Sequence, residues 1–107
     1  MAADKIISSL GSFAEILSDP KGYDPESLRN LSQQAPSPVS SFIQATLSSD
    51  EAAMQSNFSA LSDHASRTNS FEGWHNLARL AHRLFFSQAA IEYYEQAIKK
   101  SMENNFV

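Results

Sequence analysis

The sequence predicts an all-α protein of about six antiparallel helices, organised as a single helical domain over residues 1–107. Apolar residues recur every three or four positions along the chain, which is the helical period. No segment alternates apolar and polar residues with the period of a strand. Only three glycines and four prolines are present, and the short breaks between the periodic segments make consecutive helices antiparallel neighbours.

The first helix is predicted over about residues 3–18. Its apolar face repeats at i, i+4, i+7 and i+11 through Ile6, Leu10, Phe13 and Leu17. Gly11 lies inside this segment and weakens the helix by about 1 kcal/mol relative to alanine. A turn at residues 19–22 then ends it.

Prolines and capping residues mark the next two helices. Asp24 and Pro25 start the second, because the aspartate accepts hydrogen bonds from free backbone N–H groups and a proline in the first turn loses no needed donor. Pro36 ends it, and Ser37 with Pro38 starts the third. The apolar face of the third helix is formed by Val39, Phe42, Ile43 and Leu47.

The fourth helix is predicted over about residues 50–64, with a serine-rich face opposite its apolar one. The serines are interpreted as a solvated face or as close helix contacts. Its apolar face is formed by Met54, Phe58, Leu61 and Ala65. Residues 1–70 thus form a set of four upstream helices.

The last two helices form a hairpin over residues 71–104. Asn69 or Ser70 is predicted to cap the fifth helix, and Ser87 the sixth. The apolar face of the fifth helix is predicted to contain Phe71, Trp74, Leu77, Ala78, Ala81 and Leu84. That of the sixth is predicted to contain Ala90, Ile91, Tyr94, Ala97 and Ile98.

This hairpin resembles a tetratricopeptide repeat, a pair of helices with a length of about 34 residues and alternating small and large apolar positions. Trp74, Leu77 and Ala78 match the start of the first helix of the repeat, with alanine in place of glycine. Ala90, Tyr94 and Ala97 match the small and aromatic positions of the second.

The sequence departs from the repeat pattern at several positions. Ala81 stands where an aromatic residue is usual, and Met102 replaces the closing proline. Phe85 and Phe86 occupy the turn, where glycine and a polar residue are common. The upstream chain shows no second copy, and one repeat cannot bury its own apolar face. The upstream helices must therefore cover the hairpin, act as degenerate copies, or leave a face for a partner.

Composition excludes several classes of function. The net charge of −4 argues against direct binding of nucleic acid, which needs a basic surface. The absence of cysteine excludes disulfides and thiolate zinc sites. No apolar run reaches the length of about 18 residues needed to cross a membrane, and no signal peptide is apparent. The cytoplasm is the expected compartment.

The most distinctive polar cluster is a basic strip on the fifth helix, formed by His75, Arg79, His82 and Arg83. Their spacing of i, i+4, i+7 and i+8 places them on one face. The resemblance implies that this face lines a groove for peptides, and the strip would then suit an acidic peptide or helix. The alternative is an ordinary solvated face. Tyr93 is the candidate aromatic anchor, since adjacent tyrosines on a helix cannot both be buried in one layer.

No metal, cofactor or catalytic site is predicted. His75 and His82 lie two turns apart, about 10 Å along the helix axis, so they cannot ligate one zinc ion. The sequence contains no phosphate-binding glycine loop and no arrangement of a nucleophile with a base. We therefore expect a protein without enzymatic activity.

The sequence favours a protein–protein interaction module, a small adaptor or chaperone-like protein that binds a peptide or helix of another protein. The alternative is a small acidic regulator or inhibitor that binds a basic surface of an enzyme or nucleic-acid-binding protein. Residues 1–63 carry eight acidic and three basic side chains, whereas residues 64–107 carry four acidic and five basic ones. A hairpin with an uncovered face also makes a homodimer possible.

Overall fold

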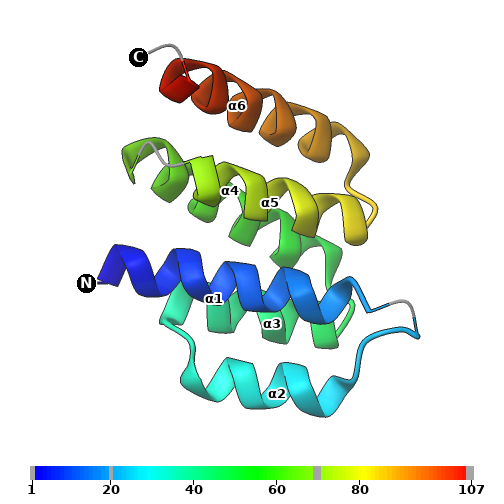
Figure 1. Ribbon diagram of the computed structural model, residues 1–107. Coiled ribbons are helices and arrows are strands. Elements are labelled where there is room, and N and C mark those ends of the chain that lie inside the picture. The colour runs from blue at the N-terminus through cyan, green and yellow to red at the C-terminus, as the bar shows by residue number, and fades with distance from the viewer. Residues whose placement is uncertain (1, 20, 69–70, 106–107) are drawn as a thin grey trace.

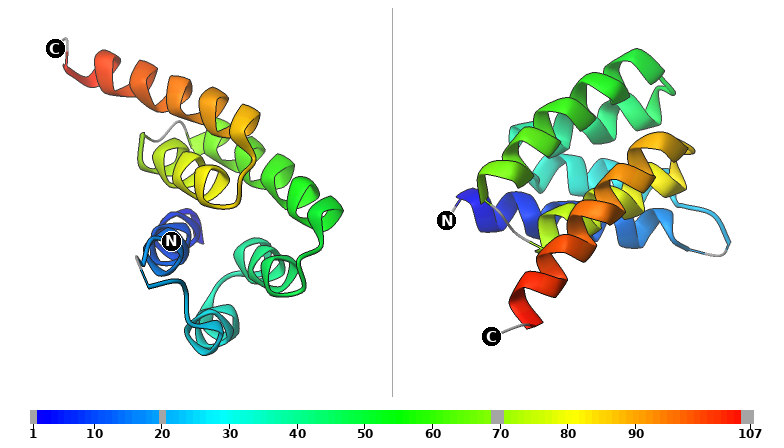
Figure 2. Two further views of the ribbon diagram at one scale, coloured as in Figure 1. Left: turned by 90° about the vertical axis from the view of Figure 1, so that its right-hand side faces the viewer. Right: turned by 90° about the horizontal axis from the view of Figure 1, so that it is seen from above.

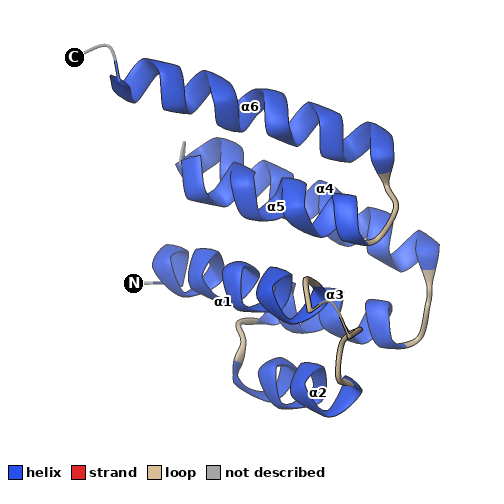
Figure 3. Ribbon diagram, turned by 45° about the vertical axis from the view of Figure 1, so that its right-hand side comes forward, coloured by secondary structure: helices blue, strands red, loops and turns tan. Residues whose placement is uncertain are grey.

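Six α-helices form the described part of the chain (Figure 1). The computed structural model describes residues 2–19, 21–68 and 71–105, with the side chains of residues 5–19, 21–68 and 71–103. No strand occurs in these ranges (Figure 3), which confirms the all-α prediction. The helices are α1 (Ala2–Leu17), α2 (Pro25–Gln34), α3 (Ser37–Leu47), α4 (Glu51–Thr68), α5 (Phe71–Arg83) and α6 (Ser87–Asn105).

Consecutive helices run in opposite directions, but helices distant in sequence also pack together. Helix α5 lies between α6 and α1 and also contacts α4, whereas α3 joins α4 to α2. Figure 2 shows α4, α5 and α6 on one side of the molecule and α2 on the other, with α1 and α3 between them. The C-terminal hairpin therefore packs directly on α1 and α4, and α2 lies beyond them.

A series of aromatic rings in contact connects α1, α3, α4 and the α5–α6 turn. Phe13 of α1 meets Phe42 of α3 edge to face, with ring centroids 5.4 Å apart. Phe42 in turn meets Phe58 of α4 at 4.6 Å, and Phe58 meets Phe86, at the α5–α6 turn, at 5.2 Å. Edge-to-face contacts are a favoured geometry for aromatic pairs. The three buried rings belong to one core cluster, and the half-buried Phe86 packs against it.

The glycine inside α1 lies against Asn76 of α5. The side-chain amide of Asn76 donates to the carbonyl oxygen of Ile7 at 3.3 Å. A Cβ atom at Gly11 would lie 3.3 Å from Nδ2 of Asn76. The missing side chain thus makes room for a buried polar residue of the neighbouring helix.

The capping residues define several of the helix ends. Asp24 caps α2, with its Oδ1 atom accepting from the backbone N–H of Glu26 at 3.2 Å. The predicted end of the fourth helix at residue 64 is wrong, because α4 continues to Thr68. The Thr68 hydroxyl donates to the carbonyl oxygens of His64 and Ala65, each at 3.2 Å. The predicted cap at Asn69 or Ser70 lies outside the described residues.

Two helices end in the same left-handed turn without a glycine. At the end of α5 the N–H of Phe86 donates to the Ala81 carbonyl at 2.9 Å, and that of Phe85 to the His82 carbonyl at 3.2 Å. This is the Schellman pattern, in which the residue after the cap usually is glycine. Here that residue is Phe85, with φ of 67°. Ser49 has the same role after α3, with φ of 54°.

The outward face of α6 differs from the sequence prediction. Ala90 and Ala97 are buried as predicted, whereas Ile91 and Ile98 are 55% and 58% exposed. Helix α6 packs mainly on α5 alone, and the two alanines allow close contact along a narrow face. The isoleucines lie beside that face, where no other described helix covers them.

We expect Phe42→Ala to lower the free energy of unfolding by about 3–5 kcal/mol, because it removes a fully buried ring between two aromatic neighbours. Urea unfolding followed by circular dichroism measures this loss. Phe85→Ala is the matched control, since the Phe85 ring is 90% exposed. Equal stabilities of the two variants would contradict the aromatic chain as the centre of the core.

We expect Phe85→Gly to raise the free energy of unfolding by about 1 kcal/mol, because an L-residue is strained in the left-handed conformation and glycine is not. Thermal and urea unfolding measure the gain. Phe85→Ala again serves as the control, as it removes the ring and keeps the Cβ atom. A gain of the same size in both variants would show that the exposed ring causes the effect, and not the backbone.

Candidate functional site

The basic strip predicted on α5 lies against the C-terminal part of α1. Nη2 of Arg79 donates to Oε1 of Glu15 at 3.2 Å, and Nη2 of Arg83 donates to the carbonyl oxygen of Ser18 at 3.4 Å. Both contacts are near the surface, where an ion pair contributes about 0–1 kcal/mol. Each guanidinium group has five N–H donors, so most of its hydrogen-bonding capacity is not used by these contacts.

Three residues of the strip meet around a small depression. Its volume is about 270 Å³, and it is lined by Ser18, Arg79, His82, Arg83 and Tyr94. The rings of His82 and Tyr94 meet edge to face, with centroids 6.4 Å apart. The structure thus brings Arg79, His82 and Arg83 together, with two residues that the sequence analysis did not assign to the site, Ser18 and Tyr94.

The other predicted residues lie away from this depression. His75 stacks on Phe71, with ring centroids 5.4 Å apart, and approaches Tyr94 at 6.3 Å. Tyr93 points to a different side of α6 from Tyr94. It lies 5.9 Å from the Trp74 ring and 6.0 Å from the Phe58 ring. The predicted set therefore divides between two surfaces.

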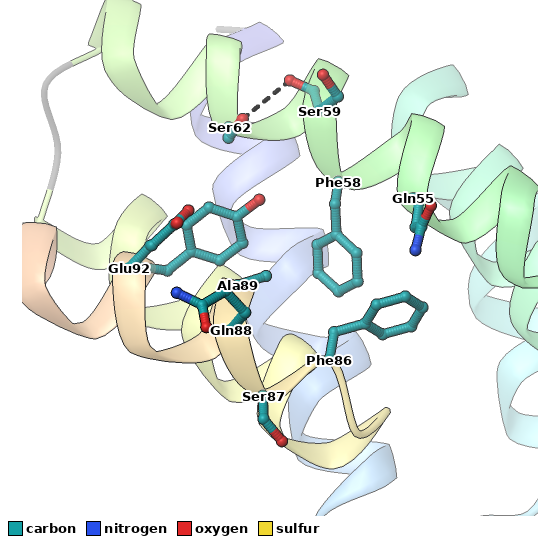
Figure 4. A pocket seen from close by; sticks show the side chains of 10 residues that line it. Gln55, Phe58, Ser59, Ser62, Phe86, Ser87, Gln88, Ala89 and Glu92 are labelled. Atoms are coloured by element: carbon teal, nitrogen blue, oxygen red, sulfur yellow. Dashed lines mark hydrogen bonds between the residues drawn. The ribbon is translucent and has the colours of Figure 1, made fainter.

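Tyr93 lines a larger groove between α4 and α6. The groove has a volume of about 450 Å³. Its aromatic residues are Phe58, Phe86 and Tyr93, and Figure 4 shows the first two with their rings turned toward one another. The other lining residues are Gln55, Ser59 and Ser62 from α4, and Ser87, Gln88, Ala89 and Glu92 from α6. The groove combines an aromatic surface with hydroxyl and amide groups.

The sequence contained a partial signal for this groove. Phe58 belongs to the predicted buried stripe of α4, and Ser59 and Ser62 belong to the serine-rich face beside it. Such a border between apolar and polar residues occurs on every amphipathic helix. Only the packing of α6 along this border shows that it forms a groove.

Tyr93 has the most perturbed environment in the groove. Burial raises the pKa of its hydroxyl above the ordinary value of 10.0. A hydrogen bond with the Ser62 side chain acts in the opposite direction, and the negative charge of Glu92 adds to the rise. The phenol therefore stays neutral at physiological pH and offers a donor inside the groove.

Several acidic side chains of the N-terminal half have local structural partners. Asp24 caps α2, and Oδ1 of Asp50 accepts from the Ala53 N–H at the start of α4 at 3.1 Å. Glu26 pairs with Arg29 at 3.0 Å. Carboxylates at helix N-termini interact favourably with the helix dipole. These groups therefore stabilise the fold, and binding to another protein is not needed to explain them.

Within residues 2–19, 21–68 and 71–105, no three His, Asp or Glu side chains gather as ligands for a metal ion. None of the helices in these ranges combines the length and apolar character that crossing a membrane requires.

Comparison with known proteins gives no relative for this chain. It matches no protein-family model, and no curated protein or solved structure is detectably similar to it. Its function must therefore be inferred from the two surfaces described above.

We expect the stability of the protein to fall as pH rises above 10.0, and Tyr93→Phe to reduce this fall. Below that pH the phenol is neutral in both the folded and the unfolded chain. Above it the unfolded chain ionises first, because the folded pKa is raised, and stability is lost until the pH exceeds the folded pKa. Urea unfolding of both proteins below and above pH 10.0 tests this. Parallel pH curves would contradict burial of the hydroxyl.

Proposed function

We propose that this chain is a non-enzymatic protein-interaction module that binds a helix or peptide of another protein in the groove between α4 and α6. The observation that supports this most is the lining of the groove, with aromatic residues from both sides and polar groups around them. Sites of this volume and composition commonly receive one or two apolar side chains of a partner.

The aromatic side of the groove is held in place before any partner binds. Phe58 is part of the ring chain that reaches α1 through Phe42 and Phe13. Phe86 is fixed by its contact with Phe58 and by the turn that ends α5. A preorganised site loses little conformational entropy on binding. Because its shape is fixed, the groove suits one particular kind of apolar anchor side chain better than side chains of many different shapes.

The polar groups determine what surrounds that anchor. Gln55 and Gln88 offer amide donors and acceptors, and Ser59 and Ser87 offer hydroxyls. Glu92 is the only carboxylate or basic group among the described lining residues. The partner segment at the groove would thus be an apolar anchor with neutral or basic neighbours.

The basic strip would make a second contact with a longer partner. Arg79 and Arg83 retain free donors beside the depression on α5, and they suit an acidic side chain. Tyr93 and Tyr94 point in different directions from α6, so one short peptide would not fill both surfaces. The groove is the primary site in this proposal.

A library of displayed peptides tests the proposal without knowledge of the natural partner. Peptides selected on the unmodified chain are measured by fluorescence anisotropy against variants. Ala89→Arg places a charged side chain in the groove, and we expect it to weaken binding by at least about tenfold, or 1.4 kcal/mol. Ala60→Arg is the matched control, because it is the same change at an exposed position of α4 outside the groove.

The double change Arg79→Glu with Arg83→Glu distinguishes the two surfaces. The fold should persist, since both side chains make only surface contacts. Peptides that lose affinity only with this change would assign binding to the strip, and the groove proposal would be wrong. Failure to select any peptide, with all variants folded, would also contradict it.

A further inference from the structure

Three exposed apolar side chains lie along the outer edge of α6. Ile91, Ile98 and Met102 are 55%, 58% and 55% exposed. Their spacing of i, i+7 and i+11 places them on one face of the helix, with the exposed Glu95 between Ile91 and Ile98. Single exposed apolar residues are common on protein surfaces, but three on one face of one helix make that face a candidate for an interface. We call these three residues the α6 stripe.

The α6 stripe is separate from the groove of the proposed function. The groove uses Gln88, Ala89, Glu92 and Tyr93 of α6. Ile91, Ile98 and Met102 do not line it, and on the helix they lie between Tyr94 on one side and Gln88 on the other. A partner on the α6 stripe would therefore leave the groove open.

The charges beside the α6 stripe change sign along the helix. Glu92 and Glu95 belong to its N-terminal half, and Lys99 follows in its C-terminal half; all three are exposed. Lys100 is engaged with Glu103 through a contact of 2.7 Å. The charge of Lys99 also helps to lower the pKa of Glu103, but among the side chains that the structure describes Lys99 forms no direct ion pair.

When two copies of α6 pack antiparallel, the acidic half of each helix lies beside the basic half of the other. In a parallel pair of α6 helices, Glu95 would face Glu95 and Lys99 would face Lys99, and like charges repel. In an antiparallel pair aligned on the stripe, Ile91 of one copy faces Met102 of the other. The two-fold axis then passes between Glu95 and Ile98, which brings Glu95 close to the other copy's Lys99.

We propose that the chain self-associates through α6, with the α6 stripes of two copies packed antiparallel. The interface is isologous, as in most homodimers, because the same surface contributes on both sides. The stripe supplies the apolar contact and the two symmetric Glu95–Lys99 pairs set the direction. Burial of the stripe also explains why isoleucine and methionine occupy positions that the fold leaves in water.

Sedimentation equilibrium of the purified chain over a range of concentrations tests the association. We expect a monomer–dimer equilibrium in the unmodified chain. Ile98→Glu should raise the dimer dissociation constant by at least about tenfold, since it places a charge at the centre of the apolar contact. The matched control is Phe85→Glu, which makes the same kind of change at an exposed position of the α5–α6 turn, outside the α6 stripe.

Charge exchange tests the direction of the pair. Glu95→Lys and Lys99→Glu should each weaken the dimer severalfold, because each places like charges together. The double variant, Glu95→Lys with Lys99→Glu, should restore it. A parallel pair would predict no restoration, since its facing charges are alike in both proteins. Circular dichroism of each variant confirms that α6 is intact.

Disulfide trapping gives an independent measure, because the natural chain contains no cysteine. A mixture of Ile91→Cys and Met102→Cys proteins should form the mixed disulfide on mild oxidation, and neither protein alone should cross-link efficiently. A disulfide between two copies of the Ile91→Cys protein would show a parallel pair and overturn the proposal. A strict monomer at all concentrations, or a dimer insensitive to Ile98→Glu, would also overturn it. These results leave the groove test unaffected, since that test uses another surface.

Discussion

The contact between Phe42 and Phe58 is the one on which the other parts of this structure depend. It is the closest ring pair in the aromatic chain, with centroids 4.6 Å apart. Phe42 connects it to α1 through Phe13, and Phe58 connects it to the hairpin through Phe86. The same ring that holds α4 in the core therefore forms part of the groove. Groove shape and core stability are linked, because Phe58 cannot move toward a ligand without losing its contacts to both neighbours.

Helix α6 illustrates how one helix can serve three surfaces. Its buried face is narrow because small residues, Ala90 and Ala97, meet α5. On one side of this face Tyr93 reaches the groove, and on the other Tyr94 reaches the depression beside the basic strip. The isoleucines lie further around the helix. A broader buried face, with large side chains at the alanine positions, would hold α6 further from α5.

The sequence predicted the number of helices, most of their ends and most of the core. Those features depend on local periodicity and on capping residues such as Asp24, which are visible within a few residues. The predicted end of α4 near residue 64 is too early, because the polar residues beyond it continue the helix, where Arg67 pairs with Asp63 at 2.8 Å. The inward assignment of Ile91 and Ile98 failed for another reason. Periodicity shows that a helix has an apolar face and does not show whether a neighbouring helix covers it.

The candidate site was predictable only in part. Arg79, His82 and Arg83 share a helix face, which spacing alone reveals, and the structure places them around one depression. Tyr93 is separated from them because it faces the groove with α4, whereas Tyr94 faces the depression with α5 and Ser18, and no local pattern encodes which element lies on which side of α6. The resemblance of the hairpin to a tetratricopeptide repeat remains a prediction.

The packing of α1 on α5 includes a hydrogen bond from the Asn76 side-chain amide to the carbonyl oxygen of Ile7, and these two residues are 69 positions apart in sequence. Because of this separation, the contact of α1 with α5 forms only after the first turns of α5 have been synthesised, whereas Phe13 can meet Phe42 of α3 earlier. During translation the part of α1 that packs on α5 therefore stays uncovered until α5 has been made, and the native fold is completed late in the synthesis of the chain.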